Sequence, residues 1–410
     1  MNETTLKNYA EIIVRIGGNV QRGQLVVINC DVRDAEFCNM VEACAYDAGA
    51  SNVMINWSSE DSTRLKYLRA TDETIFDRIP QWQVDKLNYQ DENGAVYLHI
   101  NSRNPDSLAD ADPKRIKRLA QAALKALKSH SALTMDNTLR WSTCNVPSPA
   151  WAKKVFPHLQ EQEAVEQLWK YILKAVRAEG DDPIKEWYRH TLNFAKYVDY
   201  LNGQQFAALR ITTGLGTDLT IGLVRNHLWT SAGVVAKDGV LNVVNIPTEE
   251  IFTMPHRERA DGHVVMSMPL PYRGNIIEGI ELTFENGRVS SYKASKNREL
   301  LADIIETDEG THRLGEIALV ANSSPIAQMN TLFYNVLFDE NAASHLALGK
   351  AYPANMEGGG DFTVEERLIA GGNDSLLHVD FMFGTKDMCV TGIKKDGTEI
   401  EFFRDGEFVI

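Results

Sequence analysis

The pattern of apolar residues changes once along this chain, near residue 203, and that change constrains the fold most. Before it, the β-rich runs QLVVINC (24–30) and SNVMINW (51–57) flank a stretch with apolar residues at helical spacing. A further β-rich run, AVYLHI, follows at 95–100. Alternation of strands and helices is typical of a parallel sheet covered by helices. Residues 1–203 are therefore predicted to form an α/β N-terminal domain with a parallel-type sheet.

After residue 203 the chain consists of short alternating runs punctuated by glycine, such as FAALRITTG and IIEGIELTFENGRVSSYKA. The segments ENGRV and KDGTEI predict hairpin turns, because Gly, Asn and Asp tolerate the positive φ of tight turns. Residues 204–410 are therefore predicted to form a mostly antiparallel, β-rich (α+β) C-terminal domain.

Charge and cysteine content exclude several classes of function. The 42 Lys and Arg residues against 56 Asp and Glu residues give a net charge of −14, which argues against binding to nucleic acid or to an anionic membrane surface. No apolar run approaches the ~20 residues that span a bilayer, and the start of the chain lacks a basic segment followed by an apolar one. Five cysteines without a CxxC pair fit reduced thiols. These features predict a cytoplasmic chain. No glycine-rich fingerprint follows VVINC, so no nucleotide cofactor is expected.

Ionisable residues embedded in apolar β-rich segments are the first candidates for chemistry, because burying a carboxylate is costly without a cation or several donors. In HRLGEIALV, a strand would place Glu316 on one face with Leu314, Ala318 and Val320. An edge-strand glutamate paired with Lys or Arg is the alternative for this residue.

The segment LLHVDFMF is more informative. His378 and Asp380 lie two residues apart on a predicted strand, so both side chains project to the same side. Imidazole and carboxylate are common ligands of zinc, cobalt and manganese. A hydrogen-bonded His–Asp pair that stabilises the core is the alternative.

Two other segments leave their choices open. In VVNIPTEEIF, Glu249 and Glu250 point in opposite directions on an extended chain, and spacing alone does not choose between them or exclude two solvated side chains. In ENAASHLALGKAYP, Glu340 and His345 would lie about 140° apart on a helix, unlike the one-face spacing of HExxH. A turn before a short helix that carries His345 could still bring both inward. Tyr352 follows, either donating to an oxyanion or packing.

A rival polar cluster occurs in PHRERADGH, which contains His256, Glu258, Asp261 and His263. Its two arginines would oppose a cation at close range, so this segment is predicted to be a loop containing charge pairs. No GxSxG motif supports a serine nucleophile.

The motifs VNIPTEEIF, GTHRLGEIALV, FDENAASHLALGKAYP and HVDFMFG, in this order, resemble those of the thermophilic aminopeptidase family of metallopeptidases, the group of aminopeptidase T, aminopeptidase S and PepS. The resemblance covers essentially the whole chain, with the specific motifs within residues 211–384. It implies two divalent ions (zinc, cobalt, manganese or magnesium), a homodimer, and a dinuclear site in residues 204–410. The residues that match the family's metal ligands are Glu250, Glu316, Glu340, His345, His378 and Asp380. Tyr352 matches its active-site tyrosine.

The resemblance implies a metalloaminopeptidase that removes N-terminal residues from peptides. Four carboxylates and two divalent ions balance in formal charge, and such ions lower the pKa of bound water from ~15.7 towards ~7. Glu316 is expected to hold the ions and assist proton transfer to the leaving amine, and Tyr352 to donate to the oxyanion. Glu340 is a further candidate for recognition of the α-amino group. The alternatives are a dinuclear amidase or esterase and a non-catalytic protein that binds peptides or metal ions.

Overall fold

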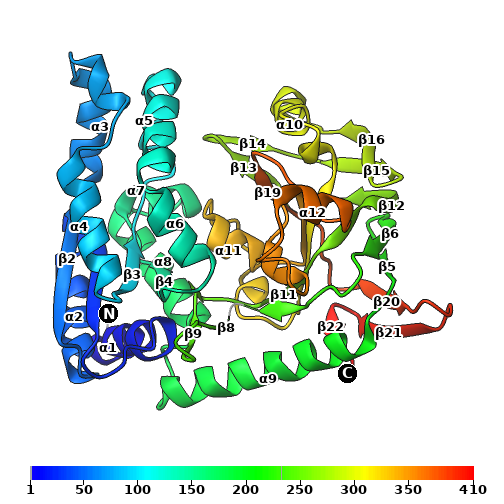
Figure 1. The fold of residues 1–410 in the computed structure, drawn as a ribbon, viewed down its shortest axis with the longest axis horizontal. Helices are drawn as coiled ribbons and strands as arrows, with labels where there is room; N and C mark the ends of the chain where they lie inside the picture. The colour runs from blue at the N-terminus through cyan, green and yellow to red at the C-terminus, as the bar shows by residue number, and fades with distance from the viewer. Residues whose placement is uncertain (1, 232) are drawn as a thin grey trace. The chain divides into compact units, whose positions relative to one another are not determined.

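The structure of the protein is a computed structural model that describes residues 2–231 and 233–410 (Figure 1). The chain forms two compact units, and each is built from two segments. The first unit comprises Met1–Arg189 and Gly233–Pro247, and the second comprises His190–Ala232 and Thr248–Ile410. The domain boundary predicted between residues 203 and 204 stays a prediction.

The first unit contains a five-stranded sheet in the order β10-β4-β3-β1-β2, in which all pairs of neighbouring strands are parallel. Its strands are β1 (Leu25–Asp31), β2 (Asn52–Ser58), β3 (Val96–Asn101), β4 (Trp141–Asn145) and β10 (Asn245–Ile246). The interior strand β1 is rich in Val and Ile and almost entirely buried, as expected where helices cover both faces of a parallel sheet. The predicted α/β class is confirmed for this unit.

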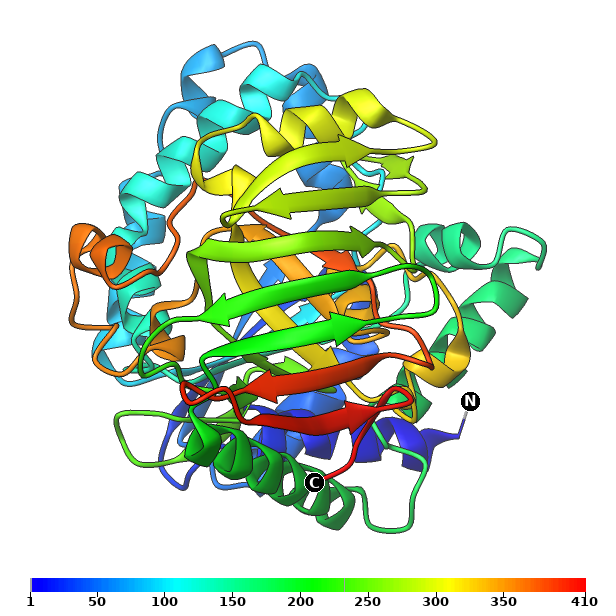
Figure 2. The ribbon, with the colours of Figure 1, turned by 90° about the vertical axis from the view of Figure 1, so that its right-hand side faces the viewer.

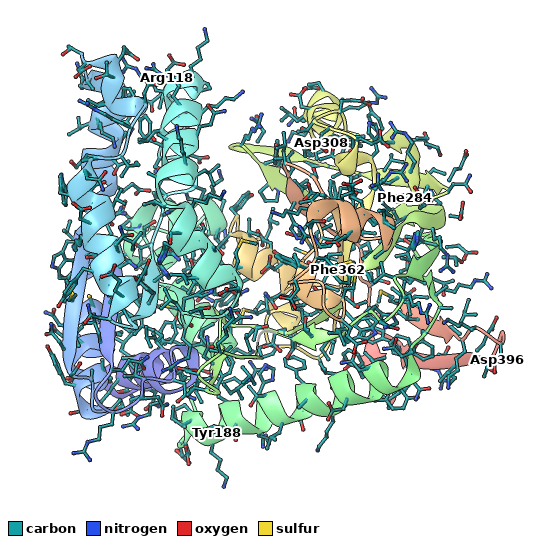
Figure 3. The ribbon with its side chains drawn as sticks, viewed as in Figure 1. Arg118, Tyr188, Phe284, Asp308, Phe362 and Asp396 are labelled. Carbon is teal, nitrogen blue, oxygen red and sulfur yellow. The ribbon has the colours of Figure 1, made fainter. Side chains whose placement is uncertain are left out.

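In the order of the chain, the helices of the first unit lie before and between its strands. They are α1 (Glu3–Ile12), α2 (Ala35–Asp47), α3 (Glu60–Arg69), α4 (Gln81–Glu92), α5 (Pro113–Ala126), α6 (Lys128–Met135), α7 (Pro149–Val155) and α8 (Glu161–Ala175). A long helix, α9 (Pro183–Gln204), continues into the second unit. Arg118 on α5, labelled in Figure 3, forms ion pairs with Glu73 and Asp77, so the basic side of this helix is a solvated, charge-paired face. A short hairpin of β8 (Gly233–Val235) and β9 (Leu241–Val243) completes the unit.

The second unit contains an antiparallel eight-stranded sheet in the order β16-β15-β12-β6-β5-β20-β21-β22, seen nearly face-on in Figure 2. Its strands are β5 (Ala208–Thr212), β6 (Asp218–Leu223), β12 (Pro255–Val265), β15 (Glu281–Glu285), β16 (Arg288–Lys293), β20 (Cys389–Ile393), β21 (Glu399–Arg404) and β22 (Glu407–Phe408). The turn predicted in ENGRV joins β15 to β16, and both Asn286 and Gly287 have positive φ there. Gly397 has the same conformation between β20 and β21. Both predicted hairpins are confirmed.

A second antiparallel sheet in this unit has the order β19-β18-β17-β11-β7. Its strands are β7 (Thr230–Ser231), β11 (Glu250–Thr253), β17 (Leu314–Val320), β18 (His345–Gly349) and β19 (His378–Met382). Alternate residues of these strands, including Ile251, Ile317, Leu319, Leu346 and Phe381, join side chains of the eight-stranded sheet in one apolar core. The other face of this antiparallel five-stranded sheet is therefore available for polar side chains.

The remaining elements of the second unit are a hairpin of β13 (Leu270–Tyr272) and β14 (Asn275–Ile277) and three helices, α10 (Arg298–Ile305), α11 (Val336–Glu340) and α12 (Val364–Ile369). Among the residues that the structure describes, none of the helices is long and apolar enough to cross a membrane.

Candidate metal centre

Most of the predicted ligands lie on the polar face of the antiparallel five-stranded sheet of the second unit, β19-β18-β17-β11-β7. Glu316 on β17 lies opposite Ala347 on β18, and Ala347 lies opposite Asp380 on β19. His345 is two residues from Ala347, and Glu250 lies opposite the end of β17, so these side chains share one face of the sheet. Side chains alternate between the two faces of a strand, so the neighbouring aliphatic residues point into the core and the ionisable residues point to the opposite face.

The predicted composition of this face was wrong at one position. A β-bulge between Leu314 and Glu316 breaks the simple alternation, and Leu314 belongs to the apolar core instead. Gly315 lies in the bulge, where a Cβ atom would come within 2.4 Å of the carbonyl oxygen of Gly349. A residue with a side chain could not take this place without moving β17 or β18.

The distances define two histidine–carboxylate groups that share Glu316. His345 Nε2 lies 3.2 Å from Glu250 Oε2 and 3.7 Å from Glu316 Oε1. His378 Nε2 lies 3.5 Å from Glu316 Oε2 and 3.2 Å from Asp380 Oδ1. The alternative of an edge-strand glutamate paired with Lys or Arg is therefore wrong for Glu316, since β17 is an interior strand and its carboxylate lies between two imidazoles.

Both histidines are oriented by backbone carbonyls. His345 Nδ1 lies 3.1 Å from the carbonyl oxygen of Ala343, and His378 Nδ1 lies 2.7 Å from that of Lys350. A carbonyl only accepts, so Nδ1 carries a proton and donates it, and deprotonation of the ring at Nε2 would present a lone pair to a cation bound among the carboxylates. This arrangement is the usual outer-shell support of a metal-binding histidine.

Two carboxylate oxygens on this face lack a hydrogen-bond donor. Glu250 Oε2 and Glu316 Oε2 are buried and have no hydrogen-bond partner within the described part of the chain. Glu250, Glu316 and His345 each offer a ligand atom, and these atoms lie within 4.8 Å of one another. Buried, unsatisfied oxygens beside imidazole nitrogens suit a divalent cation, whose charge compensates their desolvation.

Electrostatics at the site point the same way. Burial raises the pKa of the Glu316 carboxyl, and the nearby Glu250 and Asp380 oppose the relief that the two histidines provide. Burial also raises the pKa of Glu340 well above its usual range, and repulsion from Glu250 and Asp380 raises it further. The site thus holds more carboxylate charge than its own donors can stabilise.

The two imidazoles respond in the opposite sense. Burial by itself would lower the pKa of His345, but Glu250 and Glu316 outweigh it and raise this pKa well above the ordinary value. Burial is likewise outweighed at His378, where Asp380 and Glu316 raise the pKa to about 9. The same contact with His378 outweighs burial and lowers the pKa of Asp380. Without a metal, protons on the histidines partly neutralise the carboxylates; a bound cation would take over this role.

The segment between Glu340 and His345 differs from its predicted form. Glu340 is the last residue of α11, but His345 begins strand β18 and is not on a helix. The pairing of β18 with both β17 and β19 imposes the extended conformation, which residue spacing within one segment could not reveal. Glu340 lies close enough to Glu250, Asp380 and His345 for their charges to affect the pKa of its carboxyl group.

Tyr352 lies just after β18, at the start of the 3₁₀ turn Pro353–Asn355. Its ring packs 4.9 Å from the ring of His378 and 5.9 Å from that of Phe252, and 45% of the residue stays exposed. Desolvation, followed by the charges of Glu316 and Asp380, raises the pKa of the phenol, so its hydroxyl remains a donor at neutral pH. Packing of the Tyr352 ring and donation by its hydroxyl, which the sequence left as alternatives, are compatible with each other.

Glu249 is also buried, with 4% of its surface exposed, so the interpretation of two solvated glutamates was wrong. Its Oε2 lies 4.0 Å from His190 Nε2 on α9. Glu250 is the neighbour that reaches His345.

The rival cluster 255–263 forms strand β12, so the predicted loop was also wrong. Long-range pairing with β6 and β15 explains the difference. His263 Nε2 lies 3.7 Å from Glu281, and Asp261 accepts the backbone N–H of Asn286, which are local structural contacts.

Sequence reasoning missed one polar residue of this region, Asn341, which is completely buried beside Glu340. Its signal was present: an amide between a carboxylate and two alanines, in a segment already selected for its ionisable residues.

A buried face with imidazoles and carboxylates, unsatisfied oxygens and a phenol at its edge is typical of a metal-dependent catalytic site. The family model described as thermophilic metalloprotease (M29) matches residues 2–408. The chain belongs to this family.

Relatives are similar to this chain over nearly its whole length. It is 44% identical over 403 residues to aminopeptidase AmpS of Bacillus subtilis (strain 168), covering 98% of each chain. It is 42% identical over 406 residues to aminopeptidase 2 of Geobacillus stearothermophilus, covering 99% of this chain and 98% of the relative. The solved structure of wild-type AmpT from Thermus thermophilus matches with a TM-score of 0.91 and 37% identity, covering 99% of each chain.

These comparisons confirm the family resemblance, the fold class and the enzyme class: the chain is a metalloaminopeptidase, a hydrolase that requires divalent metal. The ligands, the number of ions and the roles of individual residues are taken up next as proposals.

Proposed function

We propose that this enzyme removes N-terminal residues from peptides at a site that holds two divalent ions. The proposed ligands are Glu250, Glu316, Glu340, His345, His378 and Asp380. One observation carries the proposal: Glu316 lies between His345 and His378, at 3.7 and 3.5 Å, with a further carboxylate beside each histidine. This is a duplicated ligand set with one shared carboxylate, which suits a pair of ions better than a single one.

Charge supports the same number of ions. Four ionised carboxylates carry −4, and two neutral imidazoles add nothing, so two divalent ions make the ligand set neutral. A single ion would leave two uncompensated charges on a buried face, which is costly.

When bound, divalent ions of this kind supply activated water at neutral pH and polarise the scissile carbonyl. The residues of the chain do the rest. In this proposal Glu316, which lies between the two histidines, accepts a proton from the attacking water and donates it to the leaving amine. In the same proposal Tyr352, whose hydroxyl stays protonated, donates a hydrogen bond to the oxygen of the attacked carbonyl.

An exopeptidase must also select a free α-amino group. Glu340 is the candidate, because it lies beside the other carboxylates at the end of α11 and not on a strand of the sheet. A carboxylate there can pair with an α-ammonium group in addition to binding metal.

The test uses metal-free protein resupplied with zinc, cobalt, manganese or magnesium, and a peptide panel with free and acetylated N-termini. Metal-dependent release from free N-termini only, lost in His378→Ala together with part of the bound metal, is the expected result. Equal cleavage of acetylated peptides, or bound metal without any turnover, would overturn the proposal.

The preferred metal is to be ranked by the same experiment. The proposed homodimer is tested by light scattering of the purified protein. A cytoplasmic location stays a prediction.

A further inference from the structure

Asn341 links two ligand-bearing segments that are far apart in the sequence. Its side chain has no exposed surface. Oδ1 accepts the backbone N–H of Glu249 at 2.6 Å, directly before the ligand Glu250 on β11. Nδ2 donates to the carbonyl oxygen of Leu337 on α11 at 2.8 Å and approaches Glu340 Oε1 at 3.5 Å. One amide thus connects the end of α11 to the start of β11.

The position of Glu340 depends on this connection more than the other ligands depend on theirs. Glu316, His345, His378 and Asp380 are fixed by strands that pair on one or both sides. Glu340 instead ends a five-residue helix, and its neighbour Asn341 already leaves the helical ladder. A helix this short is not stable by itself, so its end must be held by tertiary bonds.

We propose that Asn341 is a positioning residue of the metal site, which holds the Glu340 carboxylate at a set distance from Glu250 so that both can serve the same pair of ions. The inference rests on the proposed two-ion site. Asn341 does not touch metal or substrate; it acts through the two glutamates. Removing its amide breaks the hydrogen bonds to the N–H of Glu249 and to the carbonyl of Leu337 and lets Glu340 move, which weakens metal binding.

The chain offers a matched control. Asn202 on α9 uses its amide in the same manner: Oδ1 accepts the N–H of Trp229 at 2.7 Å, and Nδ2 donates to the carbonyl oxygen of Trp229 at 3.0 Å. It belongs to the same unit, and its amide bonds to Trp229, which is not a proposed ligand. Asn202→Leu therefore reports the general cost of losing such an amide, and Asn341→Leu adds any effect on the site.

The experiment titrates metal-free wild type, Asn341→Leu and Asn202→Leu with Co²⁺, following its visible absorption and calorimetric heat. Outer-shell substitutions typically cost about 10–100-fold in metal affinity. We expect Asn341→Leu to bind at least one ion 10–100-fold more weakly, while Asn202→Leu binds like wild type. High Co²⁺ should also restore much of the kcat of Asn341→Leu, because the ligands themselves remain.

Unaltered Co²⁺ affinity in Asn341→Leu, or equal losses in both variants, would overturn the inference. If Asn341→Leu does not fold, Asn341→Ser, which removes the long amide without adding apolar bulk, is titrated in its place with the same expectation. Failure of the proposed function looks different: wild type itself would then bind fewer than two Co²⁺ ions per chain, whatever the variants do.

Discussion

The antiparallel five-stranded sheet of the second unit has two contrasting faces. On one face, Ile317, Leu319 and Phe381 lie in an apolar core. On the other face, one residue along the same strands, Glu316 and Asp380 lie beside imidazoles. The apolar face stabilises the unit by removing hydrocarbon from water. The polar face does the opposite, because carboxylates that raise one another's pKa repel. Burial of the apolar face thus offsets the repulsion between the carboxylates on the polar face. A functional site can persist in this way at a cost in stability.

The largest expected effect comes from removing the shared carboxylate. Glu316→Gln keeps the shape of the side chain but loses its charge and its capacity to transfer a proton. We expect kcat to fall by about 10²–10⁴-fold. The melting temperature of the metal-free protein should stay unchanged or rise, since one of several repelling carboxylates is neutralised. Steady-state kinetics and metal-free calorimetry measure both; a large drop in metal-free stability would contradict the assigned role of this face.

A substitution on the apolar face should show the reverse pattern. Leu319 is completely buried on the central strand β17, next to the strand that carries Glu250. Leu319→Ala should lower the free energy of unfolding by about 2–5 kcal/mol through lost burial and a residual cavity. The kcat of the remaining folded enzyme should stay within a few-fold of wild type. Denaturant unfolding and active-site titration separate the two effects, and an equal loss in kcat would show that the faces are not independent.

The smallest effect concerns pH and appears only without metal. The pKa of His378 is raised to about 9 in the folded protein by Asp380 and Glu316, against burial. Its contribution to stability is therefore fully present below about pH 6.5 and is lost as pH rises towards 9, with a size on the order of 1–3 kcal/mol. Metal-free protein should lose stability across this window. Metal-loaded protein should not, because the ligand nitrogen then carries no proton. Melting temperatures at pH 6 and pH 9, with and without metal, test this.

Local periodicity was sufficient for part of the site. The two-residue spacing of His378 and Asp380 on an apolar strand predicted their shared orientation, and the structure brings both to Glu316. The family resemblance selected Glu250 over Glu249, a choice for which neighbouring positions gave no criterion. Burial could not have supplied it either, since both residues are buried.

Other features depend on contacts between distant segments. The strand at His345 exists because β17 and β19 pair with it on both sides. The bulge that turns Leu314 into the core lies where Gly315 closely approaches the chain at Gly349. The segment 233–247 returns to the first unit because β10 pairs with β4, more than ninety residues earlier in the chain. None of these pairings leaves a periodic signal within its own segment.

The change from an α/β to a β-rich pattern and the strand that carries His378 and Asp380 could be deduced from the sequence alone, because side-chain periodicity follows directly from backbone geometry. Through its motifs the sequence also indicated the family. Only the tertiary structure decided that Glu316 lies between two histidines and that Asn341 connects Glu340 to the strand of Glu250. Register and hydrogen bonding between segments set these distances, and both arise when the strands pair.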